Sequence, residues 1–231
     1  MEGTIGRSVG QNFRDILFAP QATFEDVAEQ PRWVAPLLIL AAILLAMTFI
    51  NLPMVEELQR ITITGDQRLN DAQHDQALGQ LAMWKWIGVV AAPIVFGVVT
   101  AFMGLLLWGW SAIAGAKNAE YPIAFTALVY ASTVTVLQVV LQALVIGIKG
   151  AETVAREGGP PLFGLSLFVD RGDMPALLWG QLANINFFSV WYSVLVALAA
   201  VHALKASKGA AYALGVAVFV ISGFLTALGP G

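Results

Sequence analysis

The stretch NINFFSVWYSVLVALAAVHALKASKGAAYALGVAVFVISGFL, Asn184 to Leu225, decides the fold of this chain. Two apolar runs flank a short basic turn, residues 204–209, which contains Lys205 and Lys208. Each run is close to the roughly 20 apolar residues that an α-helix needs to cross a bilayer. The pattern therefore predicts a hairpin of two membrane-spanning helices with a basic tip.

The composition of the whole chain also indicates a membrane protein. Of its 231 residues, 58% are apolar and only 12% are charged, whereas soluble domains carry about 25% charged residues. The small net charge of −3 gives no electrostatic basis for binding nucleic acid. Because the chain has no cysteine, disulfides and thiolate chemistry are excluded.

Three more apolar segments precede the hairpin. We predict spans at residues 33–54, 86–113, 123–148, 176–204 and 210–228. Residues 1–32 are predicted to form two short amphipathic helices in the membrane interface, the first ended by Pro20, the second starting at Thr23 and ended by Pro31. The expected fold is an all-α integral membrane protein, with a cytoplasmic segment 1–32 and a five-transmembrane-helix bundle at 33–228.

The polar connection between the first two spans contains a helix-start pattern, Asn70-Asp71-Ala72-Gln73. We predict a helix that begins there and continues without a break into the second span. His74 lies near Asp71 and Asp75 in the sequence, and a solvated helix explains this grouping better than a metal site does.

Five spans place the two ends of the chain on opposite sides of the membrane. The N-terminal side holds six of the twelve basic residues, namely Arg7, Arg14, Arg32, Lys117, Lys205 and Lys208. The even division does not decide the orientation, but short basic turns, such as those at Lys117 and Lys205, favour the cytoplasm. We predict a cytoplasmic N-terminus and an external C-terminus.

Basic residues on the N-terminal side are candidates for contact with anionic lipid headgroups, each contributing about 1 kcal/mol near such a surface. Trp33, at the start of the first span, is a candidate interfacial anchor. The predicted lipid-contact residues are Arg7, Arg14, Arg32, Trp33, Lys205 and Lys208.

Four amide side chains lie in or near the predicted spans: Gln138, Gln142, Asn184 and Asn186. Hydrogen bonding between helices is the favoured interpretation. The alternative is a polar cavity belonging to a small-molecule or ion channel or transporter. No ionisable residue occupies the middle of a predicted span, although such residues usually mark ion-coupled carriers. We find no catalytic or metal motif and predict no enzymatic activity and no cofactor.

Several short motifs, in order, are similar to one known family. Asn186-Phe187-Phe188-Ser189-Val190-Trp191 resembles its Asp-Leu-Phe-Ser-Leu-Trp start of the fourth span, and Ser207-Lys208-Gly209-Ala210-Ala211 resembles its Ser-Lys-x-x-Ala turn. Residues 17–24 followed by Pro31, and the segment 104–131, resemble its N-terminal and central patterns. Residues 12–228 thus resemble the Yip (Ypt-interacting protein) domain family of multi-pass membrane proteins, in its bacterial-type branch.

The resemblance implies five spans, a cytoplasmic N-terminus and a membrane-organising, scaffold or trafficking-like role. The expected partners are membrane lipids, other membrane proteins or a second copy of the chain. The Asp-Leu-Tyr-Gly-Pro motif of eukaryotic members is absent, so the resemblance does not extend their small-GTPase partnership to this chain. A composition rich in alanine, glycine and tryptophan favours a bacterial cytoplasmic (inner) membrane.

Overall fold

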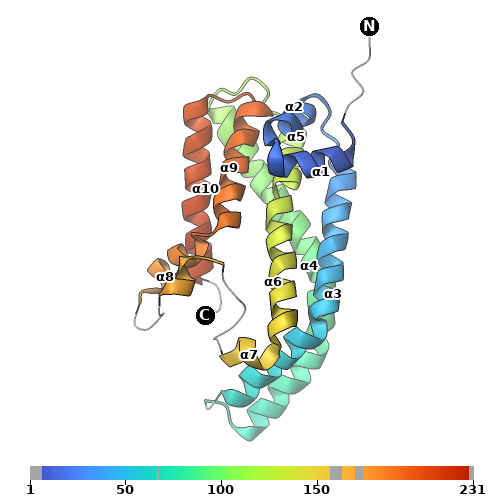
Figure 1. The fold of residues 1–231 in the computed structure, drawn as a ribbon, viewed down its shortest axis with the longest axis vertical. Coiled ribbons are helices and arrows are strands. Elements are labelled where there is room, and N and C mark those ends of the chain that lie inside the picture. Colours follow the sequence, from blue (N-terminus) through green and yellow to red (C-terminus); the bar gives the residue numbers. More distant parts are fainter. Residues whose placement is uncertain (1–6, 67, 157–162, 170–173, 229–231) are drawn as a thin grey trace. The chain divides into compact units, whose positions relative to one another are not determined.

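The computed structural model describes residues 7–66, 68–156, 163–169 and 174–228, and helices dominate these ranges (Figure 1). They form two compact units: residues 7–38, 98–135, 163–169 and 174–228 belong to the first, and residues 39–66, 68–97 and 136–156 to the second. The α-helices are α1 (Val9–Phe18), α2 (Pro20–Glu29), α3 (Val34–Gly65), α4 (Asp71–Ile113), α5 (Tyr121–Ala131), α6 (Thr133–Lys149), α7 (Ala151–Arg156), α8 (Ala176–Asn184), α9 (Phe187–His202) and α10 (Lys208–Leu228).

The predicted N-terminal helices are α1 and α2. Ser8 and Gln11 exchange hydrogen bonds that cap the start of α1. Pro20 is the first residue of α2, whereas we expected this helix to start at Thr23. The difference has a simple cause, because proline fits the first turn of a helix, where no backbone donor is required.

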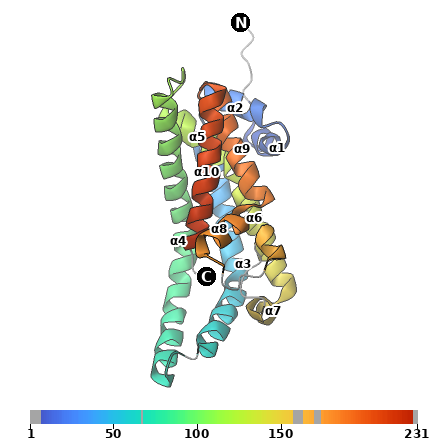
Figure 2. The same cartoon turned by 90° about the vertical axis from the view of Figure 1, so that its left-hand side faces the viewer.

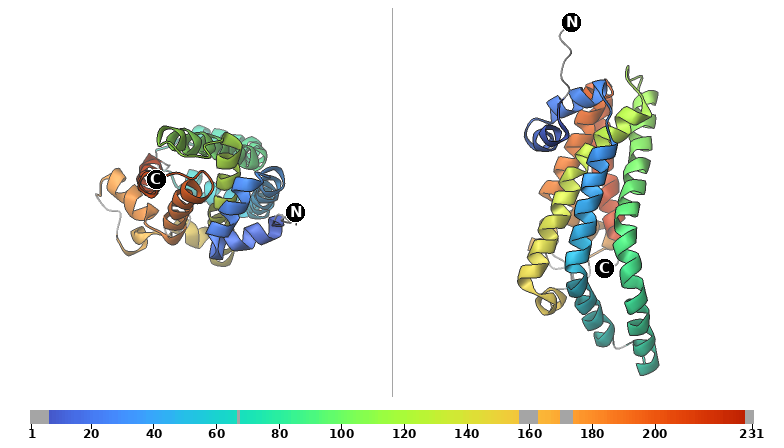
Figure 3. Two further views of the ribbon diagram at one scale, coloured as in Figure 1. Left: turned by 90° about the horizontal axis from the view of Figure 1, so that it is seen from above. Right: turned by 90° about the vertical axis from the view of Figure 1, so that its right-hand side faces the viewer.

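The apolar side of these two helices faces protein. Ile16, Phe24 and Val27 are almost completely buried in the core of the first unit, and α2 packs on α5 and α9. Figure 3 shows α1 and α2 covering one end of that unit. The burial removes these three side chains from any direct contact with lipid.

The centre of the first unit is formed by α5, α9 and α10. Residues 123–131 of α5 are all buried, and α9 and α10 run side by side (Figure 2). A Cβ atom on Gly215 of α10 would lie 2.9 Å from the carbonyl oxygen of Ser193 in α9. The two helices therefore approach closely because this position lacks a side chain.

The segment predicted as one span at 176–204 consists of two helices, α8 and α9, with a break at Ile185 and Asn186. The Asn186 side chain accepts a hydrogen bond from the backbone of Ser189 and caps α9. The Asn184 amide instead donates to the carbonyl of Phe219 in α10, 2.8 Å away. Because this bond and close packing hold α8 against α10, the chain changes direction before α9 begins.

At the ends that lie in the second unit, α3 and α4 extend beyond the apolar segments. With 32 and 43 residues, they are about 48 and 65 Å long at 1.5 Å per residue, whereas the hydrocarbon core is about 30 Å thick. Asn70 and Gln73 exchange hydrogen bonds just before α4, which confirms the predicted helix start and its continuation into the second span.

The prediction of an all-α membrane protein is confirmed. Among the described residues, four helices are long and apolar enough to span a membrane, at 34–65, 85–113, 121–149 and 208–227, and α9 is a shorter apolar helix. Large apolar side chains on their outer faces, such as Val90, Ile94 and Val98, are more than half exposed. A bilayer would cover such surfaces.

Candidate lipid-contact surface

Two turns of the first unit are joined by hydrogen bonds. The backbone N–H of Asn118, in the loop after α4, donates to the carbonyl of Leu204, and its side-chain amide donates to that of Ala203, at 3.0 and 3.1 Å. Trp110 adds a bond from its indole N–H to the carbonyl of Ala210, at 3.0 Å. The loop between α4 and α5 is therefore held against the turn between α9 and α10.

These joined turns bring three lysines to one end of the first unit. Lys117, Lys205 and Lys208 are exposed, and within the described ranges none of them has a carboxylate within ion-pair distance. We call these three residues the lysine tip. Sequence reasoning placed Lys117 in a short basic turn but did not include it among the lipid-contact residues, because only the fold joins the two turns.

Lys205 has an unusual backbone conformation. Its φ is 57°, in the left-handed region, which non-glycine residues rarely occupy. The conformation ends α9, because the amide of Ala206 then reaches the carbonyl of Ala200, while the amide of Leu204 shares the carbonyl of Ala199 with that of Ala203. Lysine thus occupies a backbone conformation that glycine adopts at a lower conformational energy.

The three predicted lipid-contact arginines lie close to two carboxylates. Arg7 and Arg14 both form ion pairs with Asp15. Arg32 lies 4.0 Å from Asp26 and donates a hydrogen bond to the carbonyl of Arg7. These arginines therefore have carboxylate partners within the N-terminal segment, whereas the tip lysines have none among the described residues.

The ion pairs of Asp15 also shift the pKa values of Asp15 itself and of Arg14. The hydrogen bond from Arg14 holds the pKa of the Asp15 carboxyl below its ordinary value, and Arg7 acts in the same direction against the opposing effect of burial. The same pair raises the pKa of Arg14. Asp15 is therefore a carboxylate at neutral pH and keeps both guanidinium groups in place.

Several aromatic side chains are exposed near this end, among them Trp33 and Phe18. Trp33 immediately precedes α3, is 39% exposed, and packs edge-on against Phe125 of α5 with ring centres 5.4 Å apart. Phe18, the last residue of α1, is 83% exposed. The sequence alone did not predict its exposure.

The four amide side chains predicted in or near the spans belong to different units. In the first unit, Asn184 bonds to α10, while Asn186 caps α9 and also donates to the carbonyl of Ala183. In the second unit, Gln138 and Gln142 of α6 are half-buried, and Gln142 lines a cavity. The structure therefore gives the two asparagines partners inside the helical bundle.

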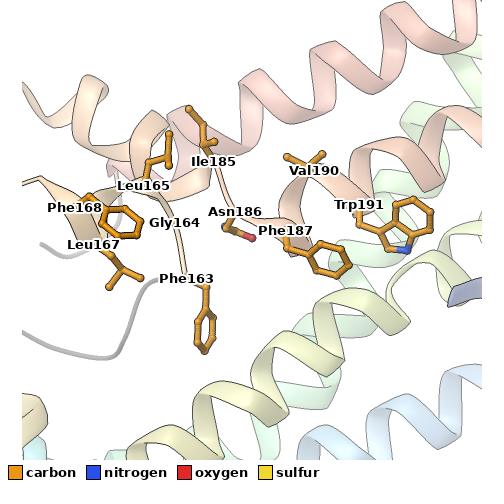
Figure 4. Close-up of a pocket in the computed structure, with 10 residues that line it drawn as sticks. All are labelled: Phe163, Gly164, Leu165, Leu167, Phe168, Ile185, Asn186, Phe187, Val190 and Trp191. Atoms are coloured by element: carbon orange, nitrogen blue, oxygen red, sulfur yellow. The ribbon is translucent and has the colours of Figure 1, made fainter.

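The first unit also has an open apolar hollow of about 530 Å³ (Figure 4). Its walls are the short 3₁₀ segment Leu165–Phe168 and the beginning of α9. The backbone of Leu165 bonds to the carbonyl of Ile185 and fixes the two stretches together. Phe168 and Phe187 are strongly exposed there, so the hollow presents hydrocarbon rather than reactive groups.

Metal ligands do not gather in the part of the chain that the structure describes: it contains no group of three or more histidine, aspartate or glutamate side chains suited to one ion. The ring of His74 lies 3.2 Å from the carbonyl oxygen of Asp66. That contact gives the histidine a backbone partner at the connection between α3 and α4.

A comparison with protein-family models matches the Yip1 domain over residues 14–229, nearly the whole chain. The chain belongs to the Yip1 domain family. Members of the Yip1 family are membrane and trafficking-associated proteins that are generally not enzymes, and in eukaryotes they interact with small GTPases. Comparisons with curated proteins and with solved structures give no match.

Proposed function

We propose that this Yip1 domain protein organises the membrane as a non-enzymatic scaffold, holding anionic lipid at the lysine tip and other membrane proteins along its spans. The supporting observation is the exposure of Lys117, Lys205 and Lys208 without ion-pair partners in the described ranges. Phe18 and Trp33 provide apolar contacts suited to the membrane interface. On the proposed topology this surface faces the cytoplasm of a bacterial cell, where anionic lipids attract basic residues.

The test is the selectivity of the reconstituted protein for spin-labelled phosphatidylglycerol over phosphatidylcholine, measured by electron paramagnetic resonance. Lys117→Gln, Lys208→Gln and Lys205→Asn each remove one charge, and asparagine tolerates the left-handed conformation of residue 205. Each loss of about 1 kcal/mol corresponds to roughly a fivefold weaker interaction.

Arg14→Gln is the matched control, because it removes one charge from the same end of the unit but from a side chain already paired with Asp15. We expect a clearly smaller change in selectivity. Equal effects of the arginine and lysine variants would contradict a specific role for the tip. Crosslinking in native membranes, followed by mass spectrometry, would identify the protein partners.

The alternative function, a channel or transporter that uses the four amides, makes a different prediction. The side chains of Asn184 and Asn186 form hydrogen bonds within the first unit. Such bonds are expected of residues that hold helices together rather than of residues that line a pathway. Flux of ions or small molecules in proteoliposomes, reduced by Gln142→Leu and unaffected by the lysine variants, would favour the alternative over the scaffold.

A further inference from the structure

The second unit contains a cavity of about 410 Å³ between its parts of α3, α4 and α6. Ligand pockets in proteins range from roughly 300 to 1,000 Å³. Its apolar wall includes Leu52 of α3, Val89 of α4 and Val139 of α6. The cavity is thus large enough for part of an amphipathic molecule.

Charged groups occupy one end of this cavity. The Lys85 ammonium donates a hydrogen bond to one carboxylate oxygen of Glu56, at 3.0 Å, and the Arg60 guanidinium donates to the other, at 3.2 Å. An ammonium has three N–H donors, so Lys85 retains two beyond this bond. Lys85 and Glu56 line the cavity. Arg60, bonded to Glu56 beside it, gives this cluster of three groups a net positive charge.

The cavity also crosses the boundary between apolar and polar sequence. Glu56 follows the end of the first predicted span at Met54, and Lys85 immediately precedes the second at Trp86. Leu52 and Val89 lie inside those spans. The charged end is therefore at the depth of lipid headgroups, whereas the apolar wall is at the depth of acyl chains.

We propose that this cavity binds one glycerophospholipid, with its phosphodiester at the Lys85 ammonium and the first part of an acyl chain along Leu52, Val89 and Val139. Charge complementarity supports this occupant, because a phosphodiester carries one negative charge. A free phosphate would leave the apolar wall without contacts, and an uncharged apolar molecule would offer the Lys85 ammonium no anionic partner.

The site is independent of the lysine tip. It lies in the second unit and uses residues of α3, α4 and α6, whereas Lys117, Lys205 and Lys208 belong to the first unit. The tip attracts many exchanging headgroups at a surface. The cavity holds a single lipid between helices, which would make that lipid part of the protein structure.

The first test fills the cavity. Gly88 lines it, and a Cβ atom at this position meets nothing within 4 Å, so Gly88→Leu places a side chain in the cavity without a backbone clash. Gly79→Leu is the control, because Gly79 also faces open space on α4 but does not line the cavity. The affinity for one bound lipid is measured by native mass spectrometry of the full chain, titrated with phosphatidylglycerol. It should fall at least tenfold in Gly88→Leu and stay unchanged in Gly79→Leu.

The second test removes the headgroup contact. Lys85→Gln should weaken phosphatidylglycerol and phosphatidylethanolamine at least tenfold, while Glu56 keeps its bond to Arg60. Diacylglycerol, which lacks the phosphate, should bind weakly to the unsubstituted protein, and Gly79→Leu, which changes neither the cavity nor the lysine tip, should leave all affinities unchanged. If diacylglycerol binds as tightly as the phospholipids, or neither cavity variant weakens them, the proposal is wrong. Should Gly88→Leu fail to fold by circular dichroism, Lys85→Gln still decides.

Discussion

The side-chain amide of Asn118 donates a hydrogen bond to the carbonyl of Ala203, 3.1 Å away, and fastens the loop after α4 to the end of α9. These residues are 85 positions apart in the sequence. Together with the backbone bond to Leu204, this contact sets the spacing between Lys117 and Lys205. The arrangement of the lysine tip therefore depends on a neutral residue, Asn118.

Asn118→Ala should destabilise the protein by about 1 kcal/mol, because it removes one hydrogen bond and leaves the Ala203 carbonyl with one partner fewer. Thermal unfolding in mild detergent measures the effect. Lys117→Ala, which changes the exposed neighbour, should alter the melting temperature little. Equal melting temperatures for Asn118→Ala and the unsubstituted protein would show that the bond is not needed.

The ionisation of Asp15 should make the stability of the protein depend on pH in the acidic range. Its pKa in the folded state is below the ordinary value of about 3.9, so its contribution is complete above that value and is lost as the pH falls through the lowered pKa. The melting temperature of Asp15→Asn should be lower than that of the unsubstituted protein at neutral pH.

The two melting temperatures should then converge as the solution is acidified below about pH 4. Glu29→Gln, at an exposed position of α2, is the control and should give a constant offset. A difference between Asp15→Asn and the unsubstituted protein that persisted undiminished in strong acid would rule out the carboxylate as its source.

Lys205→Gly should raise stability. The φ of 57° at this residue costs a side-chain-bearing residue about 1 kcal/mol relative to glycine. Lys205→Val should have the opposite effect, because a β-branched side chain is least compatible with this region. Melting temperatures of the three proteins should follow the order Gly, Lys, Val, and any other order would contradict the assigned backbone conformation.

Gly180→Ala should disturb the packing of α8 on α10. The added Cβ atom would lie 2.5 Å from the Ala227 side chain and 2.6 Å from the carbonyl of Gly223. Such overpacking costs about 1–3 kcal/mol. Gly109→Ala in α4, where nothing lies within 4 Å, should be neutral, and the difference between the two melting temperatures isolates the clash.

The proposed topology predicts opposite behaviour of reporters at the two ends of the chain. Alkaline phosphatase fused after residue 228 should be active, because this enzyme matures only outside the cytoplasm, whereas green fluorescent protein fused there should be dark. At the N-terminus, alkaline phosphatase should be inactive and green fluorescent protein should be fluorescent. A fluorescent C-terminal fusion would overturn the proposed orientation.

The sequence by itself determined the membrane helices and several of their boundaries. Runs of about 20 apolar residues must form helices in lipid, because no other local structure satisfies their backbone polar groups. The pattern from Asn70 to Gln73 likewise predicted the start of α4, because capping involves only neighbouring residues. Both signals involve only residues that are close together in the sequence, so the sequence alone is enough to recognise them.

Tertiary contacts decided the rest. The break before Asn186 is accompanied by the bond from Asn184 to Phe219. The carboxylates of Asp15 and Asp26 lie beside the arginines and not beside the tip lysines. The cavity beside Lys85 exists because α6 returns to α3 and α4 in the second unit. Each of these features joins residues that the sequence separates, so neither hydrophobic periodicity nor charge counting could reveal them.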